Sequence, residues 1–171
     1  MNLKKKILKA DFKDQAEFAA LQIGNDEYQF GLLMELFFSN DYRTCQRASW
    51  VLAHCIDNYP RLIEPYLSKM VNNLYKDIGD ASKRNTVRAF QFVDIPENLW
   101  GKTIEICFRF LNSGIEPVAI KVFSMSVLYN LSELVPEIKE ELKISIENQL
   151  PLSSAGFKSR GKKILQELFS H

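Results

Sequence analysis

The chain is poor in the residues that build metal centres, disulfide frameworks and flexible linkers. Its 171 residues include two histidines, three cysteines, seven glycines and six prolines. So little glycine and proline excludes a low-complexity linker. The cysteines Cys45, Cys55 and Cys107 are odd in number and lack CxxC spacing, which favours reduced, buried thiols in a cytosolic protein. We therefore expect a cytoplasmic location, no metal and no cofactor.

Long apolar runs and an excess of one charge are also missing. The longest apolar candidate, from Phe30 to Phe38, is interrupted by Glu35 and falls short of the roughly 18–20 residues that span a bilayer. The basic N-terminus has no apolar segment behind it, so it does not read as a secretory signal. The net charge of +1 creates no overall field toward nucleic acid or membrane. We expect no membrane partner.

Motifs of common enzyme sites are absent as well. The chain has no P-loop, no dinucleotide-binding glycine fingerprint and no G-x-S-x-G elbow. Its only histidines are His54 and the C-terminal His171, and His54 faces away from the adjacent Cys55 on a helix. The acidic pair Glu140 and Glu141 is typical of a solvated helix face. The sequence favours a role without catalysis.

What the chain does contain is a series of helical segments. Turn-forming residues divide it into segments of 12–18 residues without sustained alternation, which predicts helices and no sheet. Asp26, Asp41 and Asp80 stand where they can cap the helices that follow. After an N-terminal segment at 3–23, the helices are expected at 27–39, 42–57, 62–76, 81–93, 97–112, 116–133, 137–149 and 154–169.

An apolar template repeats every 37 residues along these helices. In the first helix of each pair it consists of Phe30, Leu33, Met34 and Phe37, then Leu67, Met70, Val71 and Leu74, then Ile104, Cys107, Phe108 and Leu111, with Leu142 and Ile146 following a one-residue slip. In the second helices the same step relates Arg47, Arg84, Lys121 and Lys158, and likewise Ala53, Phe90, Val127 and Ile164. Because one amphipathic pair cannot bury its apolar face alone, this periodicity predicts stacked pairs that share a continuous core.

Two segments make this repeat resemble a known family. Residues 41–52, DYRTCQRASWVL, resemble the second helix of a HEAT repeat, and residues 63–67, IEPYL, resemble its proline-bearing first helix. The resemblance, which does not separate HEAT from Armadillo arrays, implies an all-α, right-handed α–α superhelix (solenoid) of about four two-helix repeats plus an N-terminal cap. We predict a single domain over residues 1–171, with the cap at 1–24 and repeats at about 25–59, 60–95, 96–135 and 136–171. The polar last repeat reads alternatively as a terminal cap.

Charge is divided unequally between the two sets of helices. The second helices carry ten basic and four acidic residues, whereas the first helices carry nine acidic and six basic residues. In arrays that this sequence resembles, the second helices line the concave wall, so the resemblance implies a basic concave face. The candidate binding residues on that face are Arg47, Trp50, His54, Arg84, Arg88, Lys121 and Lys158.

Two interpretations of these residues remain open. A column of guanidinium groups beside an indole can hold a carboxylate or phosphate and stack a ring. Alternatively, the basic residues pair with the acidic turns at Asp41, Asp80 and Glu116, and Trp50 belongs to the core. We predict a protein-interaction or scaffold module that binds another protein or an acidic peptide. The alternative is a nucleic-acid-binding protein that resembles the HEAT-like DNA-alkylation-repair glycosylases, and a regulatory partner of a larger enzyme is a third reading. The oligomeric state stays open.

Overall fold

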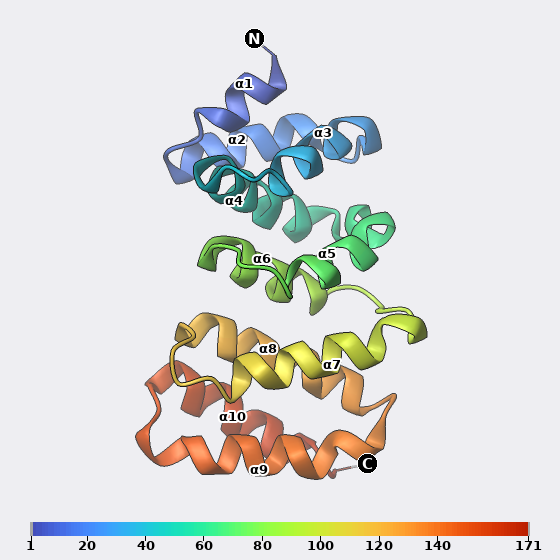
Figure 1. Ribbon diagram of the computed structural model, residues 1–171, viewed down its shortest axis with the longest axis vertical. Helices are drawn as coiled ribbons and strands as arrows, with labels where there is room; N and C mark the ends of the chain where they lie inside the picture. Colours follow the sequence, from blue (N-terminus) through green and yellow to red (C-terminus); the bar gives the residue numbers. More distant parts are fainter. Residues whose placement is uncertain (1, 171) are drawn as a thin grey trace. The chain divides into compact units, whose positions relative to one another are not determined.

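The computed structural model describes residues 2–170, and over these residues it contains α-helices and short 3-10 helices without a strand (Figure 1). The all-α prediction is confirmed. In chain order the elements are α1 (Leu3–Leu8), α2 (Lys13–Ile23), α3 (Glu27–Phe37), α4 (Tyr42–Asn58), η1 (Pro60–Tyr66), α5 (Leu67–Asn73), α6 (Asp80–Phe90), α7 (Glu97–Leu111), α8 (Val118–Ser132), η2 (Pro136–Ile138), α9 (Lys139–Gln149), η3 (Leu150–Leu152) and α10 (Ala155–Glu167).

Two of the three predicted aspartate caps are present. The carboxylate of Asp26 accepts a hydrogen bond from the backbone N–H of Gln29, and that of Asp41 accepts one from the N–H of Thr44. Both bonds satisfy donors that a helix start leaves unpaired. The prediction for Asp80 is wrong, because the extended residue Gly79 precedes the helix and Asp80 is already its first residue.

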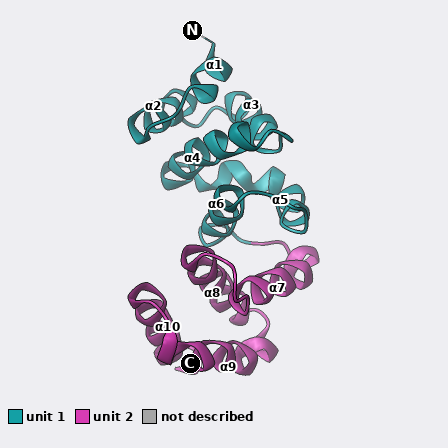
Figure 2. Ribbon diagram, turned by 60° about the vertical axis from the view of Figure 1, so that its left-hand side comes forward, with its two compact units in different colours: residues 1–94 teal, residues 95–171 magenta. Residues whose placement is uncertain are grey.

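The chain divides into two compact units, residues 1–94 and residues 95–171 (Figure 2). The first unit contains α1 to α6 and the second contains α7 to α10. The single domain expected from the sequence stays a prediction.

In the first unit the second helices stack in chain order, α2 on α4 and α4 on α6, while α3 packs against α4. The apolar template explains this packing. Its four residues on α3 are at most 2% exposed, and so are its three residues on α5 and Leu74, which directly follows α5. Residues 3–23, expected as a cap, form the helices α1 and α2, and α2 stacks on α4 as α4 does on α6. The N-terminal segment therefore behaves as one more helix pair.

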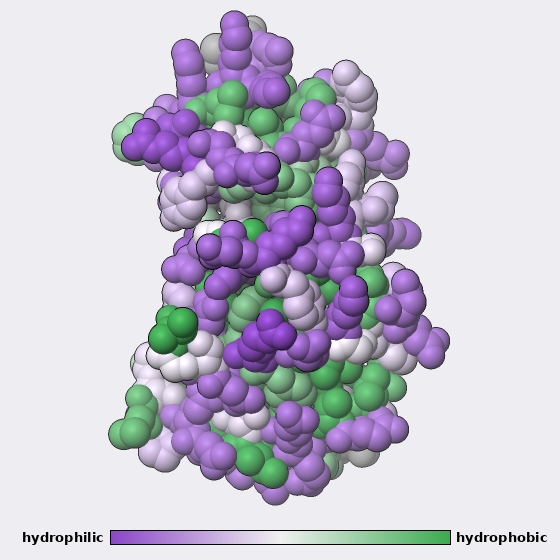
Figure 3. Space-filling model, viewed as in Figure 1, coloured by the Kyte–Doolittle hydropathy of each residue, from purple (hydrophilic) through white to green (hydrophobic). Residues whose placement is uncertain are grey.

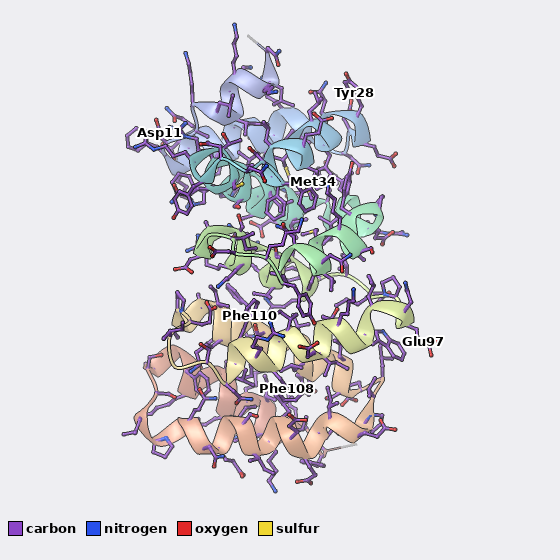
Figure 4. All side chains as sticks on the ribbon, in the orientation of Figure 1. Asp11, Tyr28, Met34, Glu97, Phe108 and Phe110 are labelled. Carbon is purple, nitrogen blue, oxygen red and sulfur yellow. The ribbon has the colours of Figure 1, made fainter. Side chains whose placement is uncertain are left out.

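The second unit pairs α7 with α8 and α9 with α10, and α8 also packs against α10. Phe108 and Leu142 are buried on the first helices as the template predicts, and Phe108 is labelled in Figure 4. The segment from Val118 to Leu134 is apolar nearly all round, a sequence pattern that predicts burial on several sides. Val118 and Leu134 are instead exposed, because both lie at ends of this helical segment.

On the face seen in Figure 3, the surface of each unit is mainly hydrophilic. Apolar side chains reach this face in small groups between charged and polar ones. Exposed apolar residues of the first unit include Phe12, Tyr28 and Tyr42. Single exposed apolar residues are normal on protein surfaces, so only those that lie together with other apolar or unpaired groups indicate a binding site.

Candidate binding groove

Helix α4 presents the candidate residues on one side because of its own amphipathic pattern. Ala48, Val51 and Leu52 are fully buried and fix the inward side of the helix. Trp50 and His54 are only partly buried, and with Arg47 they follow the i, i+3, i+7 spacing of a single helical face. The core of α4 thus forces these side chains toward a shared surface.

A groove of about 380 Å³ lies on this surface of the first unit. Three successive second helices and the turn before α2 contribute to it. It is lined by Asp11, Lys13 and Ala16 from the N-terminal pair, by Trp50, Ala53 and His54 from α4, and by Arg84 and Asn85 from α6. The two alanines leave room, while the indole and the guanidinium supply an apolar wall and a positive charge. The structure therefore brings together three of the predicted residues, Trp50, His54 and Arg84.

Two polar side chains on α6 have unused hydrogen-bonding capacity in this groove. Arg84 makes no hydrogen bond or ion pair with any other residue in the described range. Asn85 is 5% exposed, and its side-chain nitrogen is buried without an acceptor among residues 2–170. A buried donor without a partner costs about 1–3 kcal/mol. Asn85 lines the groove, so this buried donor borders the space that an occupant would fill.

Other arginines of the candidate set are already neutralised. Arg47 donates from Nε and Nη2 to one carboxylate oxygen of Asp11, at 2.9 and 2.5 Å. Asp11 lies on the turn between α1 and α2 (Figure 4). Arg88 donates to the carboxylate of Asp57 at 2.5 Å and to the carbonyl oxygen of Ala53 at 3.2 Å. Both pairs tie a helix to the preceding helix pair.

Structural pairing was thus anticipated for the right kind of residue but with other partners. The acidic turns named from the sequence were Asp41, Asp80 and Glu116, whereas the carboxylates that engage Arg47 and Arg88 belong to Asp11 and Asp57. Asp41 is held by its own helix, because the hydroxyl and the N–H of Thr44 both donate to it. Those hydrogen bonds, the hydroxyl first, lower the pKa of the Asp41 carboxyl.

The remaining two candidates lie in the second unit. The ammonium group of Lys121 on α8 lies 5.7 Å from the centre of the Phe157 ring on α10. Lys158 is half-buried on α10. The structure gives neither of them a place in the groove of the first unit.

The cysteines do not supply reactive groups at neutral pH. Burial raises the pKa of the Cys55 and Cys107 thiols to about 12, and it also raises the pKa of the half-buried Cys45. A protonated thiol is a poor nucleophile and a poor metal ligand. Among residues 2–170, no three His, Cys, Asp or Glu side chains gather as a metal site.

Comparison with protein families decides what the stacked pairs are. The family model described as a HEAT repeat domain matches residues 2–168. The chain belongs to the HEAT repeat family. The match begins within the N-terminal segment, which agrees with α1 and α2 forming a further helix pair of this HEAT repeat protein. Comparisons with curated proteins and with solved structures found no match.

In the described part of this HEAT repeat protein, no helix has the length and apolar character needed to cross a membrane.

The groove residues that sequence reasoning missed are Asp11, Lys13, Ala16, Ala53 and Asn85. One signal could have found some of them, because Ala16 lies 37 residues before Ala53 and Lys13 lies 37 before Trp50. Extending the repeat backward would have included the N-terminal helix pair in the surface.

Proposed function

We propose that this HEAT repeat protein is a non-catalytic interaction module whose groove on α2, α4 and α6 binds an acidic segment of another protein. One observation carries the proposal: within residues 2–170, Arg84 has no hydrogen-bond or ion-pair partner and the buried Asn85 amide has no acceptor, and both line a groove beside the partly exposed Trp50. Unused donors beside an indole are suited to a ligand that brings acceptors.

The chemistry of these side chains defines the ligand. A guanidinium group binds a carboxylate through two parallel hydrogen bonds, which an ammonium group cannot match. Arginine and tryptophan are also the residues most often found to dominate interface energies. Trp50 and the two alanines would receive an apolar side chain next to the carboxylate that Arg84 binds. The preferred segment therefore alternates acidic and apolar residues.

Nucleic acid is the less favoured ligand because the groove holds few available cations. Arg47 and Arg88 are engaged by Asp11 and Asp57, and Asp11 adds a carboxylate to the groove itself. Affinity for duplex DNA rises with the number of phosphates that a protein neutralises. Lys13, which also lines the groove, pairs with Glu17. Arg84, which has no partner among the described residues, supports a carboxylate ligand better than a row of phosphates.

Fluorescence anisotropy with a labelled peptide that alternates glutamate with leucine tests the proposal. Wild-type protein is expected to bind it, Arg84→Glu to weaken binding about tenfold or more, and Trp50→Ala to weaken it about tenfold. Arg43→Glu is the matched control. Arg43 is exposed on α4, a helix that contributes to the groove, but it does not line the groove itself. Equal losses in Arg84→Glu and Arg43→Glu would contradict the assignment of the groove.

A labelled DNA duplex of mixed sequence forms the second arm of the experiment. We expect weak or no binding at physiological salt, because each phosphate contact would need a free cation. Sub-micromolar duplex binding that disappears in the Arg47→Glu, Arg84→Glu double variant would favour the nucleic-acid alternative instead.

A further inference from the structure

A second recessed surface lies on the first helices of the first unit, away from the residues that line the groove. Two adjoining hollows of about 620 and 380 Å³ share Glu27, Tyr28 and Tyr66 in their walls, and together they form a trough across α3, η1 and α5. Tyr28 is 73% exposed and projects from the start of α3 (Figure 4). This trough is independent of the proposed function.

The floor of the trough is held in place by packing. The Tyr66 ring meets Phe30 edge-on, with ring centres 5.9 Å apart. Its hydroxyl lies so close to α3 that a β-carbon at Gly31 would come within 3.3 Å of it. Glycine at this position therefore lets Tyr66 settle against the helix backbone. The result is a closely packed aromatic side chain, Tyr66, beside the exposed Tyr28.

The charges of the trough are not balanced once their partners are considered. Arg61 and Glu64 pair with each other at 3.0 Å. Glu27 and Glu35 line the trough but make no hydrogen bond or ion pair with any residue in the described range. Two exposed carboxylates are thus left to interact with whatever lies in the trough.

The trough already contains one contact of the kind that a cationic ligand would make. The ammonium group of Lys69 lies 4.4 Å from the centre of the Phe38 ring, and both residues line the hollow that Glu35 borders. Cations lie over aromatic faces because the ring's quadrupole attracts them. Arginine side chains stack on tyrosine in the same way while pairing with carboxylates.

We propose that this trough binds a lysine- or arginine-containing segment of another protein, with Glu27 and Glu35 pairing its cations and Tyr28 and Tyr66 stacking on them. Charge complementarity favours this occupant, since the carboxylates of Glu27 and Glu35 outnumber the one ammonium group of Lys69, which forms no ion pair among the described residues and lies over the Phe38 ring. The protein would then hold an acidic segment on its second helices and a basic segment on its first helices.

Anisotropy with a labelled peptide that alternates arginine with serine tests the proposal. A second labelled peptide, which alternates glutamate with serine, is the opposite-charge probe. The arginine peptide is expected to bind, and Glu27→Gln with Glu35→Gln to weaken that binding about tenfold. The matched control is Glu140→Gln with Glu141→Gln, which removes the same charge from exposed positions on α9. Equal weakening by both double variants would mean that affinity follows net charge alone, and it would overturn the trough.

A second pair of variants separates stacking from charge. Tyr28→Ala is expected to weaken the arginine peptide about fivefold, whereas Tyr28→Phe keeps the ring and should bind within twofold of wild type. Tyr28 is exposed, so neither change should alter the urea midpoint of unfolding. Loss of binding in Asp11→Asn but not in the Glu27, Glu35 double variant would assign the peptide to the groove, which Asp11 lines, and overturn the trough. Concentration-dependent dimerisation abolished by the trough variants would replace the partner segment with a second copy.

Discussion

At the scale of single residues, partners decide which members of a repeated column are available. Arg47 and Arg84 occupy equivalent positions 37 residues apart, and the sequence treats them alike. Arg47 is neutralised because the turn between α1 and α2 places Asp11 beside it, while Arg84 has no such carboxylate within the described chain. Whether the basic residue at this repeat position can bind a ligand therefore depends on the turn beside it, and the 37-residue repeat does not decide it.

Removing the carboxylate of Asp11 should make the groove more attractive to an acidic ligand. Asp11→Asn deletes a negative charge that lines the groove and releases the Arg47 guanidinium from its ion pair. We expect the glutamate-and-leucine peptide to bind several-fold more tightly, as measured by anisotropy. Asp14→Asn, an exposed change on α2 outside the groove, is the control. Unchanged affinity in Asp11→Asn would place the peptide elsewhere.

The buried thiols should make the fold sensitive to alkaline pH. Burial raises the pKa of Cys55 and Cys107 from about 9 to about 12, so the fold favours the protonated form. Each protonated thiol contributes its full stabilisation of the folded state below pH 9, and this contribution is lost as the pH rises toward 12. The loss is about 1.4 kcal/mol per pH unit for each thiol.

Urea unfolding at several alkaline pH values checks this. The Cys55→Ala, Cys107→Ala double variant starts from a lower stability at neutral pH, because two buried side chains are shortened. Above pH 9, which is the pKa of an unperturbed cysteine thiol, its stability should nevertheless fall less steeply than that of the wild type. Parallel pH profiles for the two proteins would contradict the prediction.

At the scale of elements, close approach between helices explains one glycine and leaves another without a packing role. A β-carbon at Gly161 on α10 would lie 2.9 Å from Ile146 on α9 and 3.3 Å from Leu150. At Gly101 on α7, nothing lies within 4 Å of the corresponding position. The first glycine permits helix packing, while the second only lowers helix propensity.

Substitution should therefore act in opposite directions at these two sites. Gly161→Val forces added methyl groups into the contact between α10 and α9 and should destabilise the protein by about 1–3 kcal/mol. Gly101→Ala should stabilise it by about 0.5–1 kcal/mol, since alanine loses less backbone entropy in a helix. Thermal and urea unfolding of both variants provide the measurement. A stabilising Gly161→Val would mean that the two helices do not pack closely at this point.

At the scale of the whole molecule, the repeat makes stability a shared property of successive pairs. Leu67 and Phe108 belong to the same template in different units and are 2% and 7% exposed. Leu67→Ala is expected to cost about 2–5 kcal/mol and Phe108→Ala about 3–5 kcal/mol, because each leaves a cavity. Urea titrations monitored by circular dichroism measure both. Losses below about 0.5 kcal/mol at both sites would mean that the register of the repeat is wrong.

How far the sequence predicted the fold depended on the kind of signal. Leu33, Met70 and Cys107 were expected in the core because helical spacing and a constant period coincide there, and all three are buried. The start of α6 was misjudged, since an aspartate after a glycine fits either the cap or the first turn. The N-terminal helix pair is predicted to be a cap because its short helices carry little of the template, and that assignment stays a prediction.

The sequence by itself determined the helical class, the 37-residue pairing of helices and the family, because burial of an apolar face is recorded directly in residue spacing. It also determined that the second helices are basic. Only the tertiary structure decided that Asp11 and Asp57 neutralise Arg47 and Arg88, that Arg84 and Asn85 border a groove with Trp50, and that Glu27 and Glu35 border a trough. Ion pairs and hollows join residues from different helix pairs, and the distances between those residues are set by packing that no local pattern encodes.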